Sequence, residues 1–118
     1  MAQNGYQIHI LTHACCDVLI SCVQNYPELE IHFISPHQLT HALGPVYWQD
    51  QVKMLKDRFP LKNIYCWRAY KDAPGLALGG LRLGVQHIIY DGEDEHFQKI
   101  KSLANFYQAR VISSYQEI

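Results

Sequence analysis

The chain of 118 residues is long enough for one domain and too short for two ordinary ones. Apolar residues make up 48% of it and charged residues 18%, a balance that excludes an intrinsically disordered segment. The formal net charge is −1 and Lys and Arg are not clustered, so a nucleic-acid partner is not expected.

Strands alternate with helices along the whole chain. Apolar and β-branched runs predict the strands, and apolar residues at helical spacing predict the helices between them. The predicted strands are 8–12, 29–34, 64–67, 85–91 and 110–113, and the predicted helices are 15–23, 36–59 with an interruption at Gly44-Pro45, 74–83 and 91–107.

This alternation predicts a single α/β domain over residues 1–118. Its five-stranded, mainly parallel sheet would have helices on both faces, as in a three-layer domain. At this size the commonest solution is the flavodoxin-like strand order 2-1-3-4-5.

The segment 71–84 shows the transition from loop to helix most clearly. Asp72 or Ala73 would cap a helix that begins with a proline, and Gly84 would end it. We predict that the Asp72 carboxylate is the cap. Gly79 and Gly80 inside the helix each cost roughly 1 kcal/mol relative to alanine, which indicates that the backbone of a neighbouring strand approaches closely there.

The segment also carries a resemblance to a known group of proteins. Asp72-Ala73-Pro74-Gly75-Leu76-Ala77, with Leu81-Arg82 and Gly84 before an apolar strand that ends in Asp91, resembles a group of small uncharacterised bacterial α/β proteins, and Gly44-Pro45 followed by Trp48 is similar too. The likeness covers roughly the second two-thirds of the chain. It implies the α/β fold and a bacterial source, and no activity. Arg68-Ala69-Tyr70-Lys71 departs from the small, acidic loop expected in that group, so the resemblance implies no shared ligand.

No metal and no cofactor are expected. The glycine patterns of dinucleotide-binding and P-loop proteins are absent from the sequence. His37 and His41 lie four residues apart on a predicted helix, as in helical zinc pairs, but no third ligand can be assigned. 

A ligand would bind where the carboxyl ends of the first and third strands meet, because the predicted winding reverses there. Helix N-termini, Arg68 and Lys71 would favour an anion at this crevice, whereas Asp91 and the acids after it would repel one near the fourth strand. Of the aromatic residues, Trp67 should pack in the core and Tyr70 should be exposed. The candidate ligand-binding residues are His13, Cys15, Cys16, Asp17, Arg68, Tyr70, Lys71 and Asp72.

These features favour a small non-catalytic module that binds a small anionic ligand or another protein, and that could form a homodimer. The alternative is a small enzyme that uses the same crevice. Either Cys15 or Cys16 would then act as nucleophile beside His13, or Arg68 and Lys71 would hold an anionic substrate.

We expect a cytoplasmic protein with no membrane partner. No apolar run approaches the roughly 20 residues that cross a bilayer, and residues 1–5 lack the charged and apolar regions of a signal peptide. The cysteines, Cys15, Cys16, Cys22 and Cys66, form no C-x-x-C pair and fit buried, reduced thiols.

All four thiols should therefore be free. Titration of denatured, unreduced protein with a thiol reagent is expected to count about four thiols per chain. A count near two would reveal a disulfide and contradict the reducing compartment.

Overall fold

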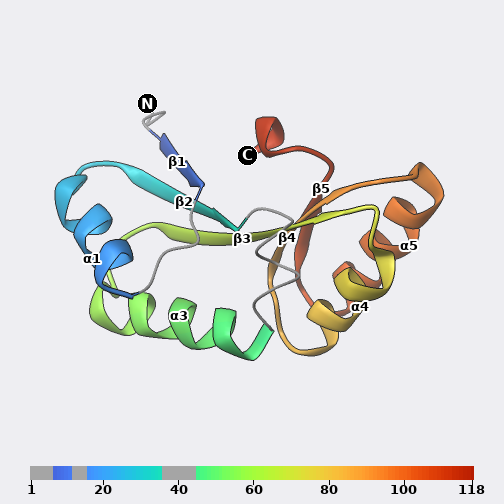
Figure 1. Cartoon of the computed structure of the whole chain (residues 1–118), viewed down its shortest axis with the longest axis horizontal. Coiled ribbons are helices and arrows are strands. Elements are labelled where there is room, and N and C mark those ends of the chain that lie inside the picture. The colour runs from blue at the N-terminus through green and yellow to red at the C-terminus, as the bar shows by residue number, and fades with distance from the viewer. Residues whose placement is uncertain (1–6, 12–15, 36–44) are drawn as a thin grey trace.

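The computed structural model describes residues 7–11, 16–35 and 45–118 (Figure 1). Strands and helices alternate along these residues, which confirms the α/β class. The strands are β1 (Gln7–Leu11), β2 (Glu30–Ser35), β3 (Ile64–Lys71), β4 (His87–Asp91) and β5 (Arg110–Ile112). The helices are α1 (Cys16–Asn25), α3 (Pro45–Arg58), α4 (Pro74–Arg82), α5 (Asp94–Phe106) and the short 3-10 helix η1 (Tyr115–Glu117).

The strands pair in the order β1-β2-β3-β4-β5, and every neighbouring pair is parallel. Ile64 of β3 lies beside Ile31 of β2, and Arg68 of β3 lies beside Ile88 of β4. The predicted flavodoxin-like order 2-1-3-4-5 is wrong, because β2 lies between β1 and β3. Each strand joins the edge that the preceding strand left open, so the sheet grows in one direction.

The four described α-helices cover one face of this sheet (Figure 1). Right-handed crossovers that always advance in the same direction leave every helix on the same side. Buried residues from all four helices, among them Leu19, Leu55, Leu81 and Ile100, share one core with alternate residues of the strands. The predicted three-layer arrangement is therefore wrong, and these elements form two layers.

The face of the sheet that no described α-helix covers, called the helix-free face below, carries a second, smaller apolar cluster. Ile34, Trp67, Ile89 and Ile112 form it, and Ile118 packs against it beyond η1. Successive side chains of a strand point to opposite faces, which separates these residues from the helix-side core. Trp67 is fully buried, as predicted, but it lies on the face opposite the helices.

The start of α4 differs from the prediction. Ala73 is the residue at the N-cap position, and no side chain caps the helix, so the predicted Asp72 cap is wrong. Asp72 instead has a φ of 52°, in the left-handed region. Within the helix, a Cβ on Gly80 would lie 2.5 Å from the Tyr70 hydroxyl, so a strand side chain and not a strand backbone makes the close approach. Gly79 has no such neighbour within 4 Å.

Helices α4 and α5 end in the same hydrogen-bonded motif. After α4, Gly84 has a φ of 95°, and the Val85 amide donates to a carbonyl of the last helical turns at 2.9 Å. After α5, Gln108 has a φ of 57°, and the Ala109 amide makes the equivalent bond at 2.8 Å. Both are Schellman ends, in which the left-handed residue is usually glycine. A glutamine therefore occupies at α5 the position that glycine occupies at α4.

Replacing Gln108 by glycine should stabilise the protein. Gln108→Gly is expected to raise the free energy of unfolding by roughly 0.5–1 kcal/mol, because glycine adopts a positive φ without a Cβ clash. Gly84→Ala is the matched opposite change and should lower the free energy of unfolding by about 1 kcal/mol. Urea denaturation measures the free energy of unfolding of both variants. A loss of stability in Gln108→Gly would contradict the idea that the positive φ of Gln108 strains the backbone.

Candidate functional site

The observed strand order removes the reason for predicting a crevice between the first and third strands. Since β2 separates β1 from β3, the winding does not reverse between them. His13 and Cys15 lie outside the described residues, as do His37 and His41. Cys16 and Asp17 begin α1, and their side chains lie outside the described part of the chain.

Arg68 and Tyr70 lie on the helix-covered face of β3. Arg68 is 2% exposed and Tyr70 is 3% exposed, so the predicted exposure of Tyr70 is wrong. The guanidinium carbon of Arg68 lies 5.9 Å from the centre of the Tyr70 ring, a cation–π distance. Burial lowers the pKa of Arg68 and raises the pKa of Tyr70.

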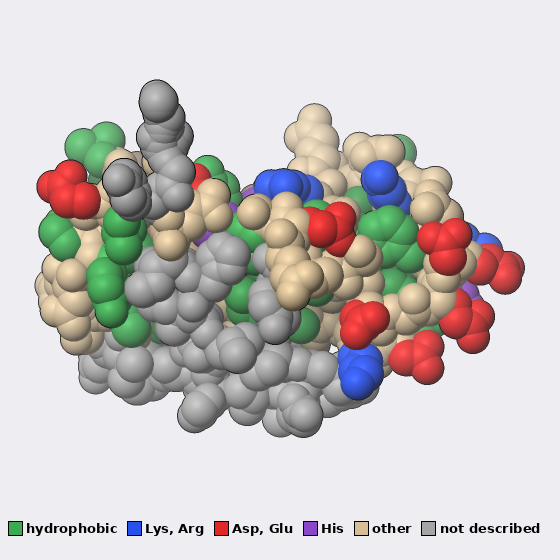
Figure 2. Space-filling view, turned by 90° about the horizontal axis from the view of Figure 1, so that it is seen from above, with side chains coloured by type: hydrophobic (Ala, Val, Ile, Leu, Met, Phe, Trp, Pro, Cys, Tyr) green, Lys and Arg blue, Asp and Glu red, His purple; other side chains and the backbone are tan. Residues whose placement is uncertain are grey.

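Lys71 and Asp72 follow at the end of β3, and both are exposed. Strand alternation places the Lys71 side chain on the face opposite Arg68, so these two cations do not converge on one anion. Acidic side chains gather at the end of the molecule that carries α5 (Figure 2), with Asp94 and Glu95 in the first turn of that helix. Ligand binding by the strand-end residues stays a prediction.

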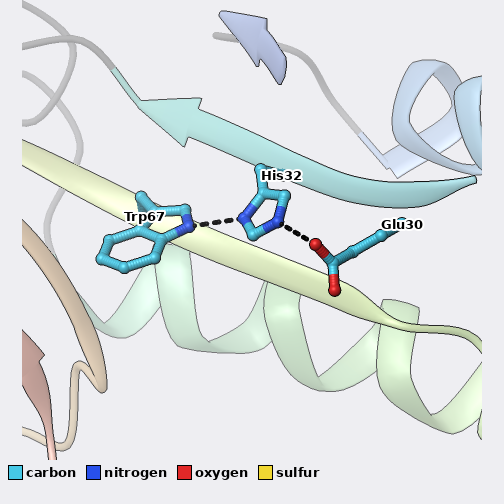
Figure 3. Close-up of polar contacts among 3 residues, drawn as sticks. All are labelled: Glu30, His32 and Trp67. Atoms are coloured by element: carbon cyan, nitrogen blue, oxygen red, sulfur yellow. Dashed lines mark hydrogen bonds and ion pairs between the residues drawn. The ribbon is translucent and has the colours of Figure 1, made fainter. Parts of the chain in front are cut away.

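A chain of hydrogen bonds crosses the helix-free face (Figure 3). Trp67 Nε1 donates to His32 Nδ1 at 2.9 Å, and His32 Nε2 lies 2.8 Å from a carboxylate oxygen of Glu30. Because the indole N–H can only donate, His32 Nδ1 must accept, and the ring proton lies on Nε2 toward Glu30. Both nitrogens of His32 are thus engaged, and the ring holds its neighbours in place.

Further side chains extend this chain into a polar and aromatic cluster. The Tyr65 ring stacks on His32 with 4.8 Å between ring centres, and the His87 ring lies edge-on to Trp67 at 4.9 Å. The Arg110 guanidinium lies 5.5 Å from the Trp67 ring centre. Burial, followed by nearby positive charge, lowers the pKa of His87 to about 4. His87 is therefore neutral at pH 7.

A groove lies on the other side of the sheet, between α3 and the residues that lead into β4. Its volume is about 510 Å³, within the range of sites that hold small molecules. Helix α1 packs against α3, and α4 packs against α5, so the groove lies where the two helix pairs meet. It is lined by Gln49, Val52, Lys56, Cys66, Val85 and Gln86, here called the inner lining, and also by the charged residues Asp50, Lys53 and Asp57, with His87 at one end.

The floor of the groove is apolar, and its thiol is unreactive. Cys66 is 7% exposed and Val85 is 3% exposed. Burial raises the pKa of the Cys66 thiol to about 12, although the nearby Lys56 ammonium lowers it slightly. The thiol is therefore protonated at neutral pH and is a poor nucleophile.

Sequence analysis did not single out the groove residues. Lys56 belongs to a helix whose alternating charges are typical of a solvated face, and Cys66 has the pattern of a core residue. The groove joins residues of α3, β3 and the segment that leads into β4, and no local pattern shows that these segments lie side by side.

Comparison with protein families, characterised proteins and solved structures gives no significant match. Within residues 7–11, 16–35 and 45–118, no three His, Cys, Asp or Glu side chains are grouped so that they could hold a metal ion. None of the helices described is both long enough and apolar enough to cross a membrane. The groove and the polar cluster therefore have to be interpreted from their own chemistry.

Stability should fall as the pH is lowered from about 6.5 to about 4, through the lowered pKa of His87. The unfolded chain has the ordinary histidine pKa and binds a proton first, so acid favours unfolding until the folded ring also protonates. His87→Gln should remove this part of the pH dependence. Urea denaturation across that pH range measures the effect. An equal decrease in the free energy of unfolding in both proteins as the pH falls would contradict it.

Proposed function

We propose that the protein is a small non-catalytic ligand-binding module and that the groove between α3 and β4 is its binding site. The composition of the groove is the observation that carries this proposal. An apolar floor of Val52, Cys66 and Val85 lies beside polar and charged side chains, among them Lys56, Gln86 and Asp50. Small-molecule sites typically combine a mostly apolar lining with a few polar groups that orient the ligand.

Catalysis in the groove has less support. The Cys66 thiol, with a pKa of about 12 because of burial, does not supply a thiolate near neutral pH. The His87 ring packs edge-on against Trp67 and Tyr65, with 4.9 Å and 5.5 Å between ring centres, and no hydrogen bond links it to Cys66 within the described part of the chain. The groove therefore lacks a paired nucleophile and base.

An enzyme at the strand ends remains the alternative. It would use Cys15 or Cys16 as nucleophile, or would hold an anionic substrate with Arg68 and Lys71. The position of Cys16 as the first residue of α1 supports the first form. The opposite orientations of Arg68 and Lys71 on β3 weaken the second.

A cytoplasmic location, a bacterial source and a homodimer belong to the same proposal. Cys22 and Cys66 are free thiols, which fits a reducing compartment. Leu83, Leu103 and Phe106 are 49%, 37% and 78% exposed, and apolar surface of this kind is commonly buried between subunits. The bacterial source rests on the sequence resemblance.

A fragment screen can test the site. Amide chemical shifts of the labelled full chain would be followed with a mixture of small acids, amines and amides. Ligands that bind should shift Val52, Cys66 and Val85, and Gln86→Trp should abolish these shifts because the indole fills the groove. Gln98→Trp, an equally exposed change on α5, is the matched control and should leave them intact.

Two results would contradict the proposal. One is that no fragment shifts the groove residues. The other is that fragments shift only residues 68–72, which would favour the strand-end site instead.

A further inference from the structure

We infer that the groove selects a ligand with an anionic group and a short apolar part, and that Lys56 binds the anion. The inference rests on the proposed ligand-binding function and names the class of ligand for the same site. It follows from how α3 distributes its charged side chains between the groove and the surface.

One side of α3 faces the groove. Gln49, Val52 and Lys56 recur at the i, i+3 and i+7 positions, which lie along one side of a helix. This side looks toward Cys66 and Val85, the floor of the groove. Lys56 is the only charged residue at these three positions.

Three of the other four charged residues of α3 lie on a ridge, and the fourth, Arg58, lines only the hollow on the α1 side. Asp50, Lys53 and Asp57 line this groove and also the hollow on the α1 side, so they stand between the two. Lys53 and Asp57 form an ion pair at 3.9 Å, and both side chains are more than two-thirds exposed. Their charges are therefore largely balanced and screened by water.

Lys56 has no such partner in the part of the chain that the structure describes. Among the described residues, no carboxylate lies within ion-pair distance of its ammonium. The Lys56 side chain is exposed and lines the groove, and its positive charge acts on both Cys66 and His87. An anion bound beside Lys56 would supply a negative charge to pair with its ammonium.

The remaining polar groups of the inner lining are uncharged. The Gln49 amide donates to the Leu83 carbonyl and bridges α3 to the end of α4. Gln86 is exposed, and its side-chain amide can donate to a carboxylate or phosphate oxygen. The two carboxylates that line the groove, Asp50 and Asp57, lie on the ridge, and Asp57 is paired with Lys53. A ligand amine beside Lys56 would therefore meet a like charge, which disfavours amines at this position.

The floor explains the apolar part of the ligand. Val85 and Cys66 are buried, and Val52 packs partly buried against the helix-side core. Methylene or aromatic carbons next to the anionic group of the ligand would pack against these side chains. Their apolar surface would be removed from water, which would tighten binding. A bare inorganic anion would not use this surface.

A charge series tests the inference. The probes are 4-phenylbutanoate, 4-phenylbutylamine and 4-phenylbutanamide, which share a tail and differ in charge. In amide chemical-shift titrations of the full chain, the carboxylate should bind in the groove at least fivefold more tightly than the other two. Lys56→Gln should weaken the carboxylate at least fivefold and leave the amide probe unchanged. Lys53→Gln, which removes the same charge from the ridge, should change carboxylate binding less than twofold.

The outcomes separate the inference from the proposed function. If the amine or the neutral amide binds in the groove as tightly as the carboxylate, or if Lys56→Gln has no effect, the inference is overturned while ligand binding stands. If Lys53→Gln weakens the carboxylate as much as Lys56→Gln, general surface charge is responsible and the inference is again overturned. If none of the three probes shifts the groove residues, both the inference and the groove as a binding site are overturned.

Discussion

Right-handed crossover between parallel strands is the constraint on which this architecture depends. Each strand joins the sheet on the same side as the one before, so every described α-helix falls on one face. The helix-side core is consequently continuous from α1 to α5. The same one-directional winding brings the residues before β4 beside α3, and the groove is the space that remains between the two helix pairs.

The two faces of the sheet are packed in different ways. The helix side is filled by interlocking aliphatic residues, whereas the helix-free side buries an indole whose N–H needs an acceptor. His32 Nδ1 provides that acceptor, and the His32 Nε2–H donates a hydrogen bond to Glu30, whose side chain is 27% exposed. A hydrogen-bond chain thus runs from a fully buried donor to a carboxylate at the surface, and no member of it is left unsatisfied.

Local patterns predicted the kinds of element well and their arrangement poorly. Apolar runs and helical spacing identified the strands and helices, and Gly84 was correctly expected to end α4, because these features depend on neighbours in sequence. Strand order does not. The orders 2-1-3-4-5 and 1-2-3-4-5 both use right-handed crossovers and differ in which edge of the sheet a strand joins. The continuous burial of β2 fits a strand with two helix layers, yet Ile34 belongs to the small cluster on the helix-free face.

The candidate site was less predictable for the same reason. Arg68 and Lys71 are close in sequence, but strand alternation separates their side chains. Lys56 and Val85 are far apart in sequence and line one groove only because α3 packs beside the residues that lead into β4. The spacing of charged residues along α3 separates Lys56 from the ridge residues on the helix surface. The sequence does not show, however, which side of the helix meets the sheet.

Sequential strand order also has a consequence for how the molecule opens. Because each strand pairs only with its neighbours in the chain, β1 or β5 can detach without breaking any pairing in the centre. The architecture in this respect resembles a one-dimensional stack, in which units are lost from the ends inward. Local unfolding should therefore proceed from both edges, and the amide protons of β3, held between β2 and β4, should be the last to exchange with solvent.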